Sequence, residues 1–223
     1  MIELFYADTP NVFKVSIALE EMGLPNKRTL VNLLEGEQLK PAIRAISPGG
    51  KVPVIVDHDP PGGGAPVSVF ESGAILIYLA DKCGKFLPTA PQQRYDTIAW
   101  VMWHMSALNP NLSLSHHFLN MAKESVPYAK EKFVKESAKL YGVLDARLEK
   151  NAFICGEYSI ADMTCWPWLL YSGLHAQRIE DYPNVLRWFK AIEQRPAVRK
   201  ALEGAFVPTL DQELERGKGT PPA

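Results

Sequence analysis

Residues 46–54, ISPGGKVPV, form the stretch that decides how the N-terminal part of the chain folds. Ser47, Pro48 and two glycines end a short helical pattern. Pro53 then stands at the start of a strand, although it has no N–H to contribute to a β-ladder. One solution is a cis Val52-Pro53 bond, which would turn the chain and expose the N–H and C=O of Val52 to a peptide-like ligand. The alternative is a trans proline that merely begins the strand.

Short apolar and amphipathic segments alternate on both sides of this stretch. Strands are predicted at residues 2–6, 27–31, 54–56 and 67–70, and helices at residues 11–23, 38–46 and 72–82. Gly23 ends the first helix, and the Pro- and Gly-rich residues 57–66 are predicted to form a loop. The resulting β-α-β-α-β-β-α order in about 85 residues is typical of an α/β domain.

The pattern changes after Gly84, and from residue 91 onward only helical periodicity is found. Helices are predicted at residues 91–120, 126–149, 160–172 and 183–195, with a short one after Pro196. We therefore expect three parts, which are an α/β domain at residues 1–85, a linker at 86–92 and an all-α domain at 93–223. The polar residues 216–223 are expected to be a frayed tail.

Composition places the chain among globular proteins and argues against several functions. It has 223 residues, of which 47% are hydrophobic and 22% are charged, and its formal net charge is −1. A balance of this kind supports a buried core and argues against binding to nucleic acid or to a membrane surface. No run of about 18 apolar residues and no secretory signal are found, so we expect a cytoplasmic protein.

The spacing of cysteine and histidine predicts neither a disulfide framework nor a metal site. Cys83, Cys155 and Cys165 are an odd number without a CxxC pair, and Cys165 lies in an apolar stretch that favours a small buried residue. The side chains of His116 and His117 diverge on a helix, and no carboxylate pattern flanks them. No metal is therefore expected.

A possible anion site lies where the first strand leads into the first helix. In residues 8–11, DTPN, the Thr9 hydroxyl and the Asn11 amide stand at a helix N-terminus. Free backbone N–H groups and the helix dipole favour an anion there, and a thiolate held at this point would have a lowered pKa. The ordinary alternative is that Thr9 or Asn11 only caps the helix.

A second strand-to-helix junction carries an acidic residue and a hydroxyl. In residues 70–75, FESGAI, Glu71 could bind an ammonium group, and Ser72 with its neighbouring backbone amides could bind a carboxylate. Those are the two charges of an α-amino acid. The alternative is a helix cap followed by an ordinary helix, with Glu71 exposed to solvent.

Residues 158–162, YSIAD, have the spacing of a capping box, with Ser159 at the cap and Asp162 three residues later. We expect this arrangement to start the helix that carries Trp166 and Trp168. No chemical role is assigned to it.

These residues together resemble the glutathione transferase superfamily over nearly the whole chain. Residues 5–11 (FYADTPN), 46–53 (ISPGGKVP), 70–75 (FESGAI) and 115–118 (SHHF) look like the bacterial nu-class enzymes, which are relatives of the yeast prion-forming nitrogen regulator. The resemblance implies a thioredoxin-like N-terminal domain and an all-α helical-bundle C-terminal domain. It also implies a homodimer that uses one or two glutathione molecules per site to reduce disulfides, with weak conjugating activity.

The resemblance also implies roles for individual residues. Thr9 and Asn11 would stabilise the glutathione sulfur. The residues implied to bind the rest of the tripeptide are Glu71 and Ser72 at the γ-glutamyl end, Val52 with Pro53 at the cysteinyl backbone, and Gln38 and Lys51 near the glycyl carboxylate. Lys132 stands where relatives carry an arginine from the partner subunit, and a lysine lacks the bidentate geometry of an arginine.

The leading hypothesis is a disulfide-bond reductase in which bound glutathione attacks a small disulfide and a second glutathione resolves the mixed disulfide. The absence of cysteine from residues 8–11 argues against a protein thiol as nucleophile.

Two alternatives stay open. One is a glutathione transferase that conjugates an electrophile or reduces an organic peroxide, and the other is a non-catalytic glutathione-binding regulatory protein. The all-α domain would form part of the dimer interface and the acceptor pocket. The candidates for the pocket wall, with core packing as the alternative for the tryptophans, are Trp100, Trp103, His104, His117 and Trp166.

Overall fold

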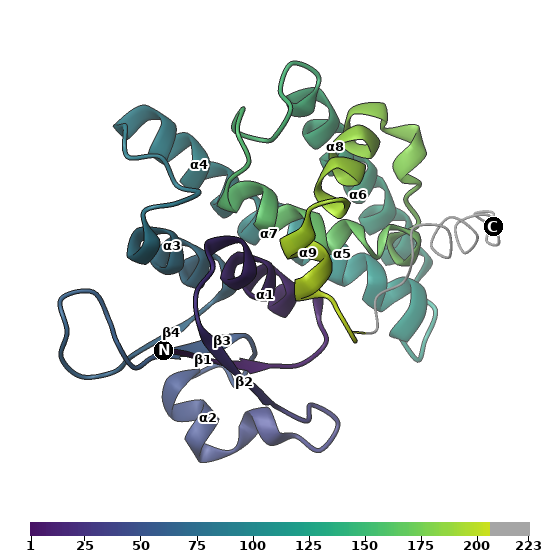
Figure 1. The fold of residues 1–223 in the computed structure, drawn as a ribbon. Helices are drawn as coiled ribbons and strands as arrows, with labels where there is room; N and C mark the ends of the chain where they lie inside the picture. Colours follow the sequence, from purple (N-terminus) through teal and green to yellow (C-terminus); the bar gives the residue numbers. More distant parts are fainter. Residues whose placement is uncertain (206–223) are drawn as a thin grey trace.

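The computed structural model describes residues 1–205, and the predicted frayed tail at residues 216–223 lies outside them. Figure 1 shows a small sheet with helices on both faces, followed by a group of helices that packs against the helices on one of these faces. The predicted order, an α/β unit followed by an all-α unit, is confirmed. The proposed domain limits remain a prediction, and helix α4 begins at Pro91, inside the expected linker.

Four strands form one mixed sheet in the order β2-β1-β3-β4. Their bounds are Ile2–Tyr6 for β1, Asn26–Leu30 for β2, Val54–Asp57 for β3 and Val67–Phe70 for β4. β1 pairs in parallel with β2 and antiparallel with β3, which pairs antiparallel with β4. Helices α1 (Pro10–Met22) and α3 (Ser72–Cys83) cover one face, and α2 (Pro41–Ile46), preceded by a 3-10 turn at Glu37–Leu39, lies on the other (Figure 1). This is the thioredoxin-like arrangement that the resemblance implied.

The ends of α1 follow from local chemistry. Thr9 has extended backbone angles and caps the helix, and Pro10 occupies the first turn, where its missing N–H costs nothing. Gly23 ends the helix in the left-handed conformation, with φ of 68°. The N-terminus of α1 is therefore held at the end of β1, where the sequence predicted it.

The remaining helices make up the second part of the chain. Their bounds are Pro91–Trp103 for α4, Asn109–His116 for α5, Pro127–Leu148 for α6, Ile160–Leu169 for α7, Pro183–Glu193 for α8 and Pro196–Ala201 for α9, with 3-10 turns at Ser172–His175 and Ile179–Asp181. Isolated β-bridges at residues 153–157 are the only strand-like pairs found after residue 90 in the described chain.

The single helix predicted at residues 91–120 contains two wider π-helical turns, at His104–Leu108 and His117–Met121. Pro110 gives the physical reason for the first. A proline in a helix interior has no N–H, and its ring crowds the carbonyl group four residues earlier, so the helix widens just before it. Helical periodicity alone does not reveal this local change.

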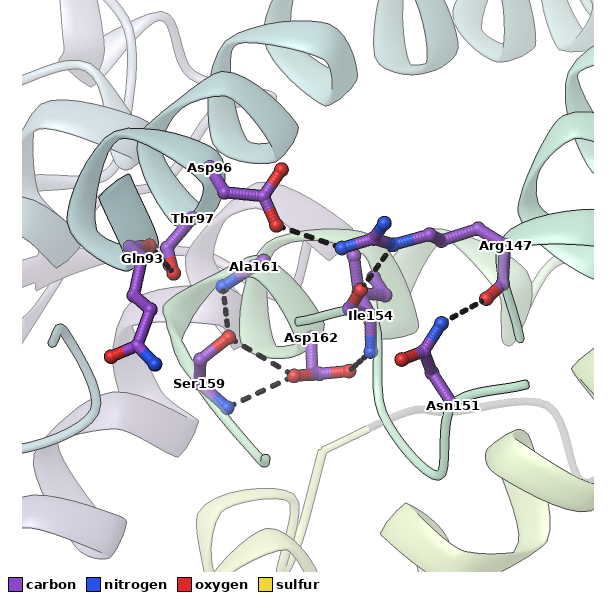
Figure 2. Close-up of polar contacts among 9 residues, drawn as sticks. All are labelled: Gln93, Asp96, Thr97, Arg147, Asn151, Ile154, Ser159, Ala161 and Asp162. Atoms are coloured by element: carbon purple, nitrogen blue, oxygen red, sulfur yellow. Dashed lines mark hydrogen bonds and ion pairs between the residues drawn. The ribbon is translucent and has the colours of Figure 1, made fainter. Parts of the chain in front are cut away.

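Helix α7 begins with the predicted capping box (Figure 2). Ser159 Oγ accepts a hydrogen bond from Ala161 N at 3.3 Å, and Asp162 Oδ2 accepts from Ser159 N at 2.9 Å. The other carboxylate oxygen accepts from Ile154 N at 2.9 Å and from Trp188 Nε1 at 2.8 Å. Burial raises the pKa of Asp162 to about 6, although these hydrogen bonds oppose the shift. The Asp162 side chain thus fixes the start of α7.

The two parts of the chain share one core at the level of α1. Helix α1 packs against α3 within its own unit and against α7 and α9 of the helical unit, as Figure 1 shows. A bidentate ion pair supports this packing, with Arg195 Nε at 2.5 Å and Nη2 at 2.9 Å from the Glu21 carboxylate. The N-terminus of α1 therefore lies beside side chains of the second unit.

In residues 1–205 no group of His, Cys, Asp and Glu side chains is arranged to hold a metal ion. None of the described helices is long and apolar enough to cross a membrane.

Candidate functional site

The Thr9 side chain caps α1, as the ordinary alternative foresaw. Its Oγ1 accepts a hydrogen bond from Val12 N at 3.4 Å, and its carbonyl oxygen accepts from the same N–H at 3.0 Å. A hydroxyl has one proton as well as lone pairs, so the Thr9 O–H group stays available to donate to a ligand. Capping therefore does not prevent Thr9 from contacting an anion at the helix end.

The Asn11 side chain does not cap the helix and instead contacts the second unit. Trp168 Nε1, in α7, donates a hydrogen bond of 3.0 Å to Asn11 Oδ1. An indole N–H can only donate, so the amide oxygen must face it and the Asn11 Nδ2 group must face away. No local signal in the sequence predicts this pairing, because 157 positions separate the two residues.

The Val52-Pro53 bond is cis, the first of the two alternatives predicted from the sequence. Within the described residues, neither the N–H nor the C=O of Val52 has a protein hydrogen-bond partner. Gln38 lies next to this segment, since a Cβ atom added to Gly50 would lie 3.1 Å from the Gln38 carbonyl oxygen. The structure thus brings Gln38 and the neighbouring Lys51 to one place, and the buried Gln38 Oε1 has no partner there in the described chain.

Glu71 joins β4 to α3 in an unusual backbone conformation, with φ of 68° and ψ of 117°. Residues other than glycine rarely adopt positive φ, and such strained positions gather at functional sites. Ser72 follows as the first residue of α3, whose first backbone N–H groups have no helical partner. The two residues predicted to bind an α-amino acid therefore both lie at the N-terminus of α3, where Glu71 is exposed and Ser72 is 3% exposed.

Comparison with known proteins identifies the family. Residues 9–82 match the model of the glutathione S-transferase N-terminal domain, and residues 106–196 match the model of the C-terminal domain. The disulfide-bond oxidoreductase YfcG of Escherichia coli is 45% identical over 205 residues, which cover 91% of this chain and 94% of that relative. The chain belongs to the glutathione transferase superfamily.

Solved structures of glutathione transferases agree with this assignment. The Burkholderia graminis enzyme, with two glutathione molecules bound per subunit, is 40% identical and has a TM-score of 0.86, covering 92% of this chain and 88% of that one. The Pseudomonas putida enzyme, with one glutathione disulfide per subunit, is 36% identical and has the same TM-score, covering 91% of each chain. The resemblance to the nu-class enzymes is thereby confirmed.

The residues proposed for the acceptor pocket fall into two groups. Trp100 and Trp103 form an edge-to-face pair with centroids 5.0 Å apart and are partly exposed, and His117 is exposed. His104 is fully buried, with no hydrogen-bond partner for either ring nitrogen among residues 1–205, and Trp166 is 1% exposed. The burial of Trp166 matches the core-packing alternative, because its ring stacks on Phe189.

Lys132, which the resemblance placed near the partner subunit's site, is exposed on α6. Its Nζ lies 6.0 Å from the centroid of the Phe133 ring. The described residues contain no ion pair to it. Its role across a dimer stays a prediction.

A residue near the site that sequence reasoning missed is Lys14, one turn after Asn11. It is 0% exposed, and its Nζ donates to Ser72 Oγ at 3.4 Å and approaches Met105 Sδ at 3.8 Å. No carboxylate forms an ion pair with Lys14 in the described chain. Burial lowers the pKa of Lys14 to about 7, which outweighs the opposing attraction of Cys165 and Glu71. The site therefore contains a buried amine that titrates near neutral pH.

The lowered pKa of Lys14 predicts a pH-dependent stability. The folded chain releases the Lys14 proton near pH 7, whereas the unfolded chain keeps it up to the ordinary lysine value of 10.5. Between these values the unfolded state binds one more proton, so the free energy of unfolding rises with pH by about 1.4 kcal/mol per unit from this group. We expect Lys14→Met to lose this part of the slope. Urea unfolding of both proteins at about pH 7.5 and about pH 9 checks this, and equal slopes would contradict it.

Proposed function

We propose that this protein is a glutathione-dependent disulfide-bond reductase whose attacking sulfur belongs to bound glutathione. The observation that carries the proposal is the N-terminus of α1. There the Thr9 hydroxyl and the Asn11 Nδ2 group remain as hydrogen-bond donors beside the backbone N–H of Asn11, which has no partner in the described chain, whereas the N–H groups of Val12 and Phe13 donate to Thr9. Donors arranged in this way stabilise a thiolate and lower the pKa of the bound thiol.

The cysteines of the chain are poorly suited to replace the glutathione thiol. Cys165 is buried in α7, and burial raises the pKa of its thiol and also that of Cys155. A raised pKa keeps a thiol protonated at neutral pH, and the protonated form is not the nucleophile. Cys83 ends α3, roughly 16 Å along the helix from Ser72 at 1.5 Å per residue.

The tripeptide is proposed to bind across the three junctions. Glu71 would pair with the γ-glutamyl ammonium, and the N-terminus of α3 with Ser72 would hold its carboxylate. The free N–H and C=O of Val52 would pair with the cysteinyl backbone, and Gln38 and Lys51 would lie near the glycyl carboxylate. Related structures hold glutathione or glutathione disulfide in each subunit, which supports a glutathione site in this fold.

The reaction then proceeds in two exchanges. The first glutathione thiolate attacks one sulfur of the substrate disulfide, so a mixed disulfide forms and one substrate thiolate leaves and takes up a proton. A second glutathione thiolate attacks the glutathione sulfur of the mixed disulfide and releases the other substrate thiol. Two glutathiones are oxidised to one glutathione disulfide, and one disulfide is reduced to two thiols.

The active form is proposed to be a homodimer, with Lys132 directed toward the partner subunit. The acceptor disulfide would lie against the partly exposed Trp100 and Trp103, with His117 nearby. A glutathione transferase that conjugates electrophiles would use the same thiolate and the same wall. The two reactions are therefore distinguished by the relative rates at which the protein reduces a disulfide and conjugates an electrophile.

Turnover of a small dialkyl disulfide and of a chloronitrobenzene, each with glutathione, tests the proposal. We expect the disulfide to be reduced faster than the chloronitrobenzene is conjugated, because the 45% identical relative YfcG is a disulfide-bond oxidoreductase. As a control, a variant with Cys83, Cys155 and Cys165 all replaced by Ala should keep its disulfide reductase activity. Faster conjugation than disulfide reduction, or loss of activity in the cysteine-free variant, would refute the proposal. If the folded wild-type protein catalyses neither reaction, the result would favour a non-catalytic glutathione-binding protein.

A further inference from the structure

Trp168 lies in α7, outside every motif that predicted the site, yet it contacts Asn11. Its side chain is 7% exposed, and its indole N–H donates to Asn11 Oδ1 at 3.0 Å. We propose that Trp168 is a positioning residue that holds the Asn11 amide with its Nδ2 group toward the glutathione sulfur. The inference rests on the role proposed above for Asn11.

The need for such a residue follows from the chemistry of the amide group. An asparagine side chain has an acceptor oxygen at one end and a donor nitrogen at the other, and the two ends have nearly the same shape. Only the nitrogen end stabilises a thiolate, because the oxygen end would place a partial negative charge against it. A donor-only partner on the far side selects the correct orientation.

The surroundings of Trp168 hold the indole in place. Its ring stacks on His175, with centroids 5.9 Å apart and an angle of 27° between the planes. His175 is fully buried, and burial lowers the pKa of its imidazole to about 3, so the ring is neutral. Helix α7 itself packs along α1 and is fixed at its start by the Asp162 carboxylate. Trp168 therefore approaches Asn11 from a rigid element.

The consequence is that the all-α unit takes part in activating the sulfur as well as in forming the acceptor pocket. The thiolate-stabilising amide belongs to the α/β unit, and its orientation is decided by a side chain of the other unit. A transferase chain cut after residue 90 would keep Asn11 but lose the group that orients it.

Trp168→Phe tests the proposal, with Trp166→Phe as the matched control. Trp166 lies on the same helix and also donates an indole hydrogen bond, 3.0 Å to the Phe189 carbonyl oxygen, but it does not contact Asn11. We expect Trp168→Phe to lower kcat for disulfide reduction roughly tenfold and to leave KM for glutathione within about twofold. The thiol pKa of bound glutathione, followed by the ultraviolet absorbance of the thiolate, should rise by about one unit. Trp166→Phe should change neither kcat nor this pKa.

A double-mutant cycle with Asn11→Ala separates this inference from the proposed function. If Trp168 acts through Asn11, Trp168→Phe has little further effect once Asn11 is Ala. Additive losses, or a normal thiol pKa in folded Trp168→Phe, would overturn the inference while leaving the proposed function intact. Normal activity in Asn11→Ala would overturn the inference together with the thiolate-stabilising role proposed for Asn11, whereas the disulfide reductase proposal is decided by the comparison of the two substrates above.

A second measurement needs no change at Trp168. The indole N–H resonance of Trp168 in a ¹⁵N spectrum should shift strongly in Asn11→Ala, whereas that of Trp166 should stay in place. An unchanged Trp168 resonance would contradict the hydrogen bond on which the proposal depends.

Discussion

Replacing Asn11 with Ala is expected to lower kcat for disulfide reduction by about two orders of magnitude, with a much smaller change in KM for glutathione. The reason is that the Asn11 Nδ2 group is proposed to donate to the developing thiolate, whereas the tripeptide is proposed to bind through Glu71, Ser72 and Val52. Removing one donor aimed at a reacting anion typically costs this much. Steady-state kinetics with varied glutathione at a saturating disulfide separates the two parameters.

Asn11→Asp is the sharper companion variant. The carboxylate has the shape of the amide and still accepts the hydrogen bond from Trp168, but it cannot donate and it brings a negative charge next to the sulfur. It should therefore be at least as slow as Asn11→Ala and should raise the thiol pKa of bound glutathione. A variant whose only defect is a higher KM for glutathione would assign Asn11 to binding, and a fully active variant would show that Asn11 does not stabilise the thiolate.

Replacing Asp162 with Ala is expected to destabilise the fold by about 3–5 kcal/mol. The Asp162 carboxylate is fully buried and accepts hydrogen bonds from the backbone of Ile154 and Ser159 (Figure 2). It also accepts one from the Trp188 indole. Its removal leaves these buried N–H groups without an acceptor, at about 1–3 kcal/mol for each unsatisfied group. Thermal unfolding should show a midpoint lower by roughly 10 °C, at about 2–4 °C per kcal/mol for a chain of this size.

The control for this prediction is Asp96→Ala. Asp96 is drawn in the same figure and pairs with Arg147 at 2.7 Å, but both side chains are partly exposed. Exposed ion pairs contribute at most about 1 kcal/mol, so this variant should unfold close to the wild-type temperature. Equal decreases in the unfolding midpoint of the two variants would show that the buried hydrogen bonds of Asp162 stabilise the fold no more than the exposed ion pair of Asp96 does.

The elements of the N-terminal unit could be predicted because their signals are local. Thr9, Pro10 and Gly23 mark the ends of α1, and each acts on backbone groups within a few residues. The capping box at Ser159 is local in the same sense. For Pro53 the local signal was ambiguous, because both a cis and a trans bond could start the strand, and the structure shows the cis form.

The helical unit was harder to predict in detail. The stretch 91–120 has one continuous helical period, and the two π turns inside it leave that period nearly unchanged. Trp166 and Trp168 stand two positions apart in an apolar stretch, so composition could not say which of them approaches the site. In the folded chain Trp166 stacks on Phe189 in the core, and Trp168 donates to Asn11.

The sequence by itself determined the order of elements, the helix ends and the motifs at the strand-to-helix junctions, since these depend on neighbouring residues. The tertiary structure alone decided which way the Asn11 amide faces and that Lys14 is a buried amine beside Ser72. Those properties come from helices that meet across the two units, where burial removes water and a partner 157 positions away supplies the hydrogen bond. Hydrophobic periodicity and motif spacing do not predict contacts between side chains so far apart in the sequence.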